Sequence, residues 1–492
     1  MPPSWTRCGI LAALVAYAVF VAIHVGAVPG GSDTSGYFNE ARLFSHLRIH
    51  EPVRTIPGLP PDAAPPYLYV PLGFRPAFDG ASRLVPTYPP GLSLMLVPAA
   101  WVLGWRYAGD FVLVLSSVAG LVLTYRLGRI CGLGRGWARA GAALLAMSPL
   151  YLYMSFWAMS DVPALVWAAA AVIAAWKSRK CPPWALGAGI FAAIGFLVRP
   201  SNFMVVLPMA IAIGASPRRL LLAALGGIPG VAVWMALNHA AYGGYFESGY
   251  GDIGNEFHGY LVLGTLRYYV TWLPVALTPL VVLALGIAAF LGSRTRVALM
   301  LGSWIVAYVA FYAPYRWTHE DWWFLRFLLP AAPAFLVAAL IVLQRLIDAL
   351  GGRMSEARRL GVLALLLLFS LYESKQHYRP LNVPTIGHGE LKYGRVATWL
   401  KANIPENAAI AATQFSGAAY FYTGYTVVRL DQLLAGAAGK VQAAAAAQHQ
   451  PVFAVVFPFE TDSLGSLPGT WAKFGTVNDV TIWRSDWGGP AR

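Results

Sequence analysis

Residues 9–37 of the chain read GILAALVAYAVFVAIHVGAVPGGSDTSGY. The apolar part, residues 9–26, is long enough to cross a hydrocarbon layer of about 30 Å, and it carries no secretory cleavage pattern. It therefore predicts a retained membrane anchor. The glycine-rich turn that follows puts Asp33 just beyond the end of this anchor, where a charged side chain is costly unless it is paired or used.

The rest of the chain shares this apolar character. Of its 492 residues, 58% are hydrophobic and 12% are charged, against roughly a quarter charged in a typical soluble domain. The formal charge of +14 does not indicate a nucleic-acid partner, because the Lys and Arg residues gather in short loops between apolar runs. The three cysteines are scattered and predict neither a disulfide nor a metal site.

Ten further apolar runs predict membrane spans, which gives eleven in all. They are residues 111–127, 138–157, 162–176, 184–198, 203–215, 220–237, 273–291, 297–312, 325–346 and 360–372. Every second short loop between them is basic, and the positive-inside rule assigns such loops to the cytoplasm. One more apolar stretch, residues 90–105, is short and rich in Pro and Gly, so we expect it to lie flat on the outer face.

These patterns predict a mainly α fold, a polytopic membrane helix bundle of about 11 spans with interfacial helices in its first outer loop. The bundle module covers residues 1–375, and the first outer loop covers residues 29–108. A small extracytoplasmic α/β domain is expected over residues 376–492, with strands at 408–412, 426–430, 451–457 and 477–483. We expect a multi-pass plasma-membrane protein with a cytoplasmic N-terminus, and abundant Ala and Arg indicate a bacterial source.

Two carboxylates stand where outer turns meet helices. Asp33 follows the first span, and Asp161 lies in a short turn just before Pro163. Each also fits a helix cap, since both precede helix-like segments. If the fold brings both carboxylates to the same level of one helix bundle, they would suit general-base chemistry or the binding of a divalent ion. A metal therefore stays an open alternative, although no metal ligands are assigned.

Arginines at the outer ends of predicted spans form a second group. They are Arg199, Arg267, Arg316 and Arg326. Such residues can snorkel to lipid headgroups, or as a group they can bind an anionic ligand, because a guanidinium grips phosphate bidentately. Nearby, Glu247 lies among tyrosine and phenylalanine rings that suit a sugar face as well as a membrane interface.

The order of these signals resembles the GT-C superfamily of membrane glycosyltransferases, in particular bacterial relatives of protein mannosyltransferases and of the lipid A aminoarabinose transferase. The motifs that carry the resemblance are Gly31-Ser32-Asp33 with Tyr37, Thr87-Tyr88-Pro89-Pro90-Gly91, Ser160-Asp161, Val198-Arg199-Pro200 and Arg326-Phe327-Leu328-Leu329-Pro330.

The resemblance implies a hexosyl or pentosyl transferase that inverts the anomeric carbon at the outer face of the membrane. Its donor would be a polyprenyl-phosphate-linked sugar, and its acceptor a glycan, lipid or protein of the cell envelope. Asp33 would be the base and Asp161 a second catalytic residue. We expect substrate-binding contacts from Tyr37, Tyr88, Arg199, Glu247, Arg267 and Arg326.

Two other classes of function fit parts of the pattern. A transporter or lipid flippase for cell-envelope precursors would use the same charges as gate residues, although its site would lie near the bilayer midplane. An anchored adhesion or assembly protein would leave Asp33 and Asp161 without a shared cavity. The clustering of charges on one predicted side favours the transferase.

Overall fold

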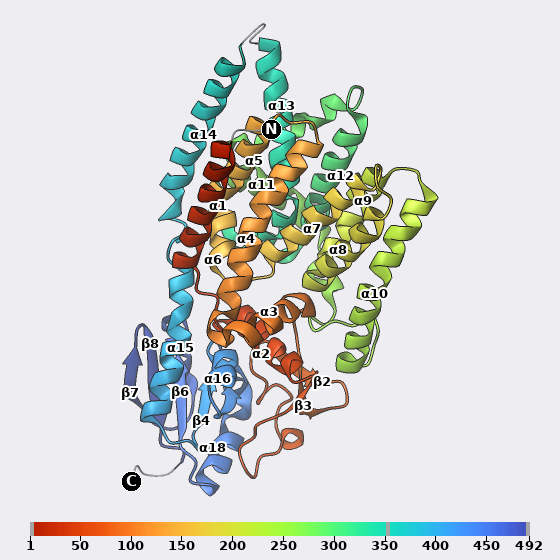
Figure 1. Cartoon of the computed structure of the whole chain (residues 1–492). Helices are drawn as coiled ribbons and strands as arrows, with labels where there is room; N and C mark the ends of the chain where they lie inside the picture. Colours follow the sequence, from red (N-terminus) through yellow and green to blue (C-terminus); the bar gives the residue numbers. More distant parts are fainter. Residues whose placement is uncertain (1–3, 351–354, 489–492) are drawn as a thin grey trace. The chain divides into compact units, whose positions relative to one another are not determined.

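The computed structural model describes residues 4–350 and 355–488 (Figure 1). The chain divides into two compact units. The first unit comprises Met1–Val25, Asp110–Val233 and Asp252–Ile386. The second comprises Gly26–Gly109, Trp234–Gly251 and Gly387–Arg492. The second unit therefore combines the first long loop with the C-terminal part of the chain, while the predicted boundary at residue 375 stays a prediction.

The predicted apolar runs are helical, and the mainly α character is confirmed. The main helices that carry them are α1 (Ser4–His24), α4 (Trp105–Ile130), α5 (Arg135–Met147), α6 (Pro149–Phe156), α7 (Asp161–Lys177), α8 (Trp184–Val198), α9 (Val206–Ile213), α10 (Pro217–Tyr242), α11 (Val262–Ala276), α12 (Thr295–Tyr312), α13 (Ala332–Leu350) and α14 (Glu356–Tyr378). Short 3-10 segments extend several of them, namely η2 (Pro200–Val205), η5 (Pro279–Phe290) and η7 (Trp322–Ala331).

Two of the runs predicted as spans, 138–157 and 273–291, are each interrupted by a break in the helix, while their crossing of the membrane stays a prediction. The breaks fall at Ser148, before Pro149, and at Thr278, before Pro279. A residue that precedes proline is pushed out of the α region, and both Ser148 (ψ 123°) and Thr278 (ψ 146°) are extended. Each side chain then caps the following helix, accepting the N–H of Tyr151 or Leu280.

Four helical stretches among the described residues are long and apolar enough to cross a membrane, or up to six if each bent pair is one span. They include α4, α10 and α12, and the stretch Trp322–Ala349 is the fourth. Shorter apolar helices include Cys8–His24 and Pro90–Leu103. The predicted count of eleven crossings therefore stays a prediction.

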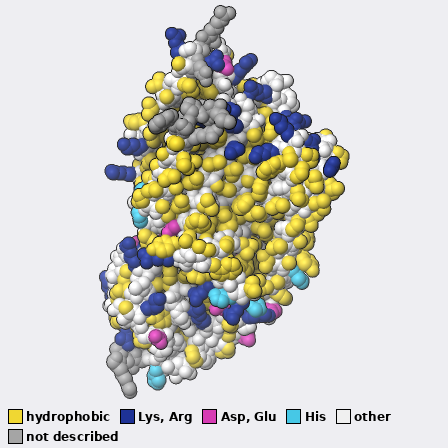
Figure 2. All heavy atoms as spheres, viewed as in Figure 1, with side chains coloured by type: hydrophobic (Ala, Val, Ile, Leu, Met, Phe, Trp, Pro, Cys, Tyr) yellow, Lys and Arg dark blue, Asp and Glu magenta, His cyan; other side chains and the backbone are white. Residues whose placement is uncertain are grey.

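The helices of the first unit differ in how much of their apolar surface is buried within the protein. In the most apolar stretch of Trp322–Ala349, 89% of the residues are buried, whereas in the most apolar stretch of α10 the share is 11%. Leu221 and Ile228 on α10 are exposed, and Figure 2 shows the apolar surface in yellow. A helix that is apolar all round and buried on so little of its surface is typical of one that faces lipid.

Basic loops meet at one end of the first unit. Arg179 lies in the loop after α7, Arg219 in the first turn of α10 and Arg296 in the first turn of α12. Desolvation lowers the pKa of Arg179, and the nearby charges of Arg296 and Arg219 lower it further. Because α7 runs from Asp161 to Lys177 and α8 runs back from Trp184 to Val198, Asp161 and Arg199 lie at the opposite end of these helices. The sequence predicts that the basic end faces the cytoplasm.

The second unit begins with α2 (Ser32–Ser45) and a small antiparallel sheet in the order β1-β3-β2. Its strands are β1 (Glu51–Pro52), β2 (Phe74–Ala77) and β3 (Gly80–Pro86). The stretch predicted to lie flat forms α3 (Pro90–Leu103), which ends where Gly104 adopts a φ of 75°. Leu92, Leu96 and Val97 of α3 are buried.

The C-terminal part of the second unit is a five-stranded sheet in the order β5-β4-β6-β8-β7. Its elements are α15 (Ile386–Asn403), β4 (Ala409–Ala412), α16 (Ser416–Tyr422), β5 (Thr426–Arg429), α18 (Ala438–Ala447), β6 (Val452–Val456), η9 (Pro458–Ser466), β7 (Trp471–Val477) and β8 (Val480–Ser485). Strand β4 pairs in parallel with β5 and β6, while β8 is antiparallel to both of its neighbours.

Alternate residues of the central strands pack in opposite directions, as the period of two requires. Ile410 packs with α15 and α16, whereas Ala411 packs with α18. The strands predicted at 408–412, 426–430 and 451–457 are confirmed. The single strand predicted at 477–483 is wrong, because the turn between β7 and β8 falls inside it, with Asn478 at a φ of 56°.

Candidate functional site

The start of α2 carries the first candidate residue. The N-cap of this helix is Gly31, so the interpretation of Asp33 as a cap is wrong. Asp33 instead lies in the first turn, half-buried, and its carboxylate accepts a hydrogen bond from the Tyr88 hydroxyl at 2.8 Å. Tyr88 immediately precedes the two prolines that lead into α3, so the contact joins two distant parts of the first long loop.

Tyr88 is held on three sides. Its hydroxyl is 3.0 Å from Ser32 Oγ, and its ring lies against Gly36, where a Cβ would collide with it. The rings of Tyr37 and Tyr250 lie 5.0 and 5.9 Å away, centroid to centroid. Burial and the neighbouring Asp33 raise the pKa of Tyr88 well above its usual value. Tyr88 therefore keeps its proton and acts as a donor to Asp33.

A segment from the end of α10 adjoins this group. Arg75 of β2 donates to the carbonyl of Ser248 at 2.8 Å, and its guanidinium lies 5.3 Å from the Tyr242 ring centroid. Gly249 approaches the backbone of Thr87 so closely that no side chain would fit. This packing brings Tyr250 beside Tyr88, and the aromatic faces offer a surface suited to a sugar ring. Glu247, on the same segment, is exposed.

A buried carboxylic acid on α2 was not among the residues predicted from the sequence. Glu40 is 3% exposed, and its carboxyl oxygen lies 2.6 Å from Ser93 Oγ. The same Ser93 hydroxyl donates to the Tyr37 carbonyl at 2.9 Å. A hydroxyl has one proton to donate, so Ser93 can serve only one of these two acceptors at a time. Burial raises the pKa of Glu40 to about 8, so the acid holds its proton at neutral pH.

A second group lies in the first unit. Asp161 is the first residue of α7, is fully buried, and forms an ion pair with Arg199. Arg199 follows the last residue of α8 and precedes Pro200, and its extended backbone (ψ 109°) turns the chain there. The cap position of α7 is Ser160, so the cap interpretation of Asp161 is also wrong. Its second oxygen, Oδ2, has no hydrogen-bond partner among the described residues.

Arg326 belongs to the same group. Its guanidinium lies over the rings of Trp323, Phe324 and Phe327, at 4.7, 5.5 and 5.5 Å from their centroids. Arg199 lies 5.1 Å from the centroid of the same Phe327 ring. Two guanidinium groups therefore adjoin one aromatic ring in a largely buried setting, where charge interactions are stronger than in water.

The predicted site residues thus fall into two groups. Asp33, Tyr37 and Tyr88 lie together in the second unit, while Asp161, Arg199 and Arg326 lie together in the first. Arg267 on α11 is exposed, as is Glu247. No set of three His, Cys, Asp or Glu residues in the described part of the chain is arranged to hold a metal ion.

Comparison with known proteins places this fold. Residues 106–239 match the family model described as dolichyl-phosphate-mannose-protein mannosyltransferase. The crystal structure of ArnT from Cupriavidus metallidurans bound to undecaprenyl phosphate is similar with a TM-score of 0.59 and 13% identity, covering 98% of this chain and 99% of that one. No curated protein sequence matches the chain significantly.

Two further solved structures are similar over most of this chain. The archaeal oligosaccharyltransferase AglB from Archaeoglobus fulgidus, in complex with an inhibitory peptide and a dolichol-phosphate, has a TM-score of 0.54 and 13% identity, covering 93% of this chain and 70% of that one. Arabinofuranosyltransferase AftD from Mycobacteria has a TM-score of 0.55 and 13% identity, with coverage of 96% and 40%. The predicted resemblance is confirmed: the fold is that of the GT-C membrane glycosyltransferases.

Proposed function

We propose that this protein is an inverting glycosyltransferase that moves a sugar from a polyprenyl-phosphate donor to an acceptor on the outer face of a bacterial plasma membrane. The observation that carries the proposal is the half-buried Asp33 carboxylate, oriented by Tyr88, whose ring lies beside those of Tyr37 and Tyr250. A fixed carboxylate beside surfaces suited to sugar is what a general base for a hydroxyl acceptor needs.

In the proposed reaction, Asp33 takes the proton from an acceptor hydroxyl as that oxygen attacks the anomeric carbon of the donor. The bond between this carbon and the lipid phosphate oxygen breaks, and the phosphate leaves with the electron pair. Attack on the face opposite the leaving group inverts the carbon. A positioned base contributes about 10²–10⁴-fold to the rate, and Tyr88 keeps the carboxylate in one orientation.

The arginines of the first unit supply the second part of the proposal. Arg326, buried against aromatic rings, stabilises the charge that develops on the departing phosphate. Arg199 is held by Asp161, so this pair keeps a guanidinium and a carboxylate fixed at the ends of α8 and α7. The ArnT and AglB structures contain undecaprenyl phosphate and dolichol-phosphate, which supports a lipid-phosphate donor.

A transporter of cell-envelope precursors is the competing function. A transport site lies near the middle of the membrane, formed by broken helices. Asp161 begins α7 and Arg199 follows α8, at the end of these helices opposite the predicted cytoplasmic side, and charges gathered on one side of the membrane favour the transferase.

The test uses purified protein in nanodiscs with hexose and pentose donors on polyprenyl phosphate. We expect sugar to move to a cell-envelope acceptor, with release of polyprenyl phosphate that depends on the acceptor. A parallel assay in sealed vesicles follows the donor across the bilayer. Translocation of the donor without any transfer of sugar would contradict the proposal and favour the transporter.

A further inference from the structure

The carboxyl ends of the parallel strands β5, β4 and β6 form an edge that carries many polar side chains. In open α/β sheets, ligands bind at such an edge where the strand order reverses. Here β5 and β6 lie on opposite sides of β4, and Thr413, Gln414, Asp431 and Glu460 follow the strand ends. This edge therefore has the position of a ligand site.

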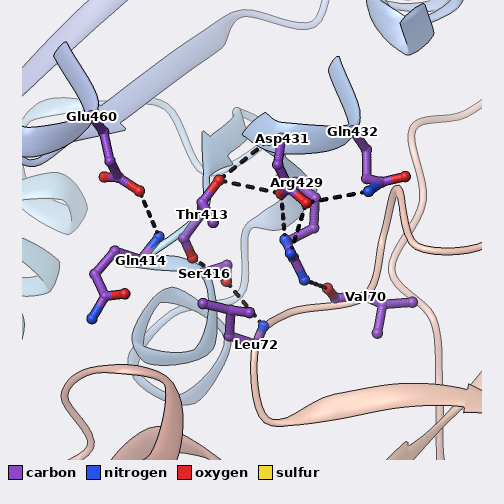
Figure 3. A network of polar contacts seen from close by, with 9 residues as sticks. All are labelled: Val70, Leu72, Thr413, Gln414, Ser416, Arg429, Asp431, Gln432 and Glu460. Carbon is purple, nitrogen blue, oxygen red and sulfur yellow. Dashed lines mark hydrogen bonds and ion pairs between the residues drawn. The ribbon is translucent and has the colours of Figure 1, made fainter. Parts of the chain in front are cut away.

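The first long loop of the same unit occupies the edge instead (Figure 3). Arg429 donates to the carbonyl of Val70 at 3.2 Å and is paired with Asp431 through two hydrogen bonds. The Leu72 N–H donates to Ser416 Oγ at 3.0 Å. These bonds fix residues 70–72 against the ends of β4 and β5. The polar groups of the edge are thus used to hold the chain's own loop.

The same edge reaches the segment that precedes Asp33. Glu460 accepts the backbone N–H of Gln414 at 2.9 Å (Figure 3), and the Gln414 side chain donates to the Tyr393 hydroxyl at 3.0 Å. A Cβ on Gly31 would lie 2.8 Å from Gln414 Nε2. Gln414 therefore packs directly against Gly31, two residues before Asp33.

Glu390 of α15 completes this contact. It is 8% exposed, and its Oε2 accepts the Gly31 N–H at 3.2 Å and lies 3.3 Å from Thr34 Oγ1. Gly30 leaves room for this carboxylate, because a Cβ there would collide with it. The cap residue Gly31 has no side chain of its own to satisfy the first turn. A carboxylate that lies 359 positions away in sequence thus stabilises the start of α2, where a negative charge also complements the helix dipole.

We propose that the C-terminal part of the second unit is a positioning device for the catalytic loop, in which Gln414 at the sheet edge packs on Gly31 and Glu390 of α15 holds the first turn of α2 that carries Asp33. This inference rests on the proposed function for its effect on catalysis. Glu390 does not take part in the reaction. It orders the first turn of α2, and a displacement of about 1 Å in a catalytic group can cost about 10²-fold in rate.

The test compares Glu390→Ala with Glu390→Gln in the full-length protein. We expect the alanine variant to lower kcat by about 10–100-fold with the KM for the lipid donor unchanged. The glutamine variant retains an oxygen that accepts the Gly31 N–H and stays within about threefold of wild type. Asp479→Ala is the matched control, since it breaks the exposed ion pair with Lys392 on the same helix and should leave kcat unchanged.

A second readout is independent of activity. Hydrogen–deuterium exchange of peptides covering residues 29–38 should accelerate in Glu390→Ala and stay at the wild-type rate in Asp479→Ala. An unchanged kcat, or a lost kcat with unchanged exchange in this segment, would overturn the proposal. If Glu390→Ala fails to fold, Glu390→Asp shortens the side chain by one methylene so that its carboxylate no longer reaches the Gly31 N–H, and unchanged exchange and kcat in that variant would overturn the proposal equally.

The two proposals fail in different ways. If Asp33→Asn retains full transfer, the assignment of Asp33 as base is lost, whereas the exchange experiment still reports whether Glu390 orders the start of α2.

Discussion

Tyr88 is the side chain that fixes the Asp33 carboxylate, through a hydrogen bond of 2.8 Å. Tyr88→Phe removes this donor but keeps the ring that packs on Gly36. We expect kcat to fall by about tenfold, equivalent to about 1.4 kcal/mol, with little change in the KM for either substrate. Steady-state transfer kinetics test this. A wild-type kcat would show that Asp33 is oriented by other contacts.

Glu40 makes the stability of the protein depend on pH. Its pKa is about 8 in the fold, against the ordinary value of 4.5. Between these values, the folded state holds a proton that the unfolded chain has lost, so stability falls as pH rises from about 4.5 to about 8, by at most about 1.4 kcal/mol per pH unit. Glu40→Gln should flatten this dependence, because the amide donates to Ser93 without titrating.

Thermal unfolding of the wild type and of Glu40→Gln in detergent at pH 5.5 and pH 8 measures the effect. The variant should gain in Tm relative to the wild type at the higher pH. Parallel pH dependences for the two proteins would mean that the buried carboxyl is not the group responsible.

At the scale of elements, η7 presents Arg326 to the group formed by the ends of α7 and α8. Arg326→Ala should raise the KM for the lipid donor by about tenfold or more and leave the KM for the acceptor nearly unchanged, because a guanidinium that binds phosphate contacts only the donor. Arg267→Ala, which removes an exposed arginine, serves as the comparison. Equal losses for donor and acceptor would assign Arg326 a structural role.

Much of the element structure could be predicted, because it depends on local patterns. The apolar runs predicted the helices, and short β-rich runs predicted strands β4, β5 and β6. The helix breaks before Pro149 and Pro279 could also have been predicted, since the residue before proline rarely continues a helix. The hairpin between β7 and β8 was missed because its turn, at Asn478, falls inside an otherwise strand-like run.

The candidate site was predictable only in part. Asp33, Asp161 and the arginines stood out because charges at helix ends are rare in apolar chains. Glu40 did not, because a glutamate within α2 looks like a solvated residue until Ser93, 53 positions away, is known to contact it. Glu390 was missed for the same reason, since its partners at the start of α2 are more distant still. Long-range pairing of polar groups leaves no local signal.

At the scale of the whole molecule, the account depends on which segments face the outside. Residues 90–105 are predicted not to cross, so Ser82 and Tyr107 should lie on one side of the membrane and Gly134 on the other. All three positions are exposed in the structure, so a cysteine placed there can react if the reagent reaches it. The background should lack Cys8, Cys131 and Cys181.

In intact cells, a membrane-impermeant thiol reagent should label Ser82→Cys and Tyr107→Cys and should spare Gly134→Cys until the cells are opened. Protection of Tyr107→Cys alone would make α3 a membrane span and would move every later basic loop to the outside, against the positive-inside rule.

The central claim is that Asp33 is the base for sugar transfer, and Asp33→Asn tests it most directly. The substitution keeps the shape of the side chain and a polar contact for Tyr88 but removes the basic oxygen. Transfer from a polyprenyl-phosphate sugar should fall by at least about 10²-fold, with expression and Tm unchanged. Asp62→Asn, at an exposed position of the same loop, should transfer at the wild-type rate. Retention of activity in a folded Asp33→Asn variant would contradict the account.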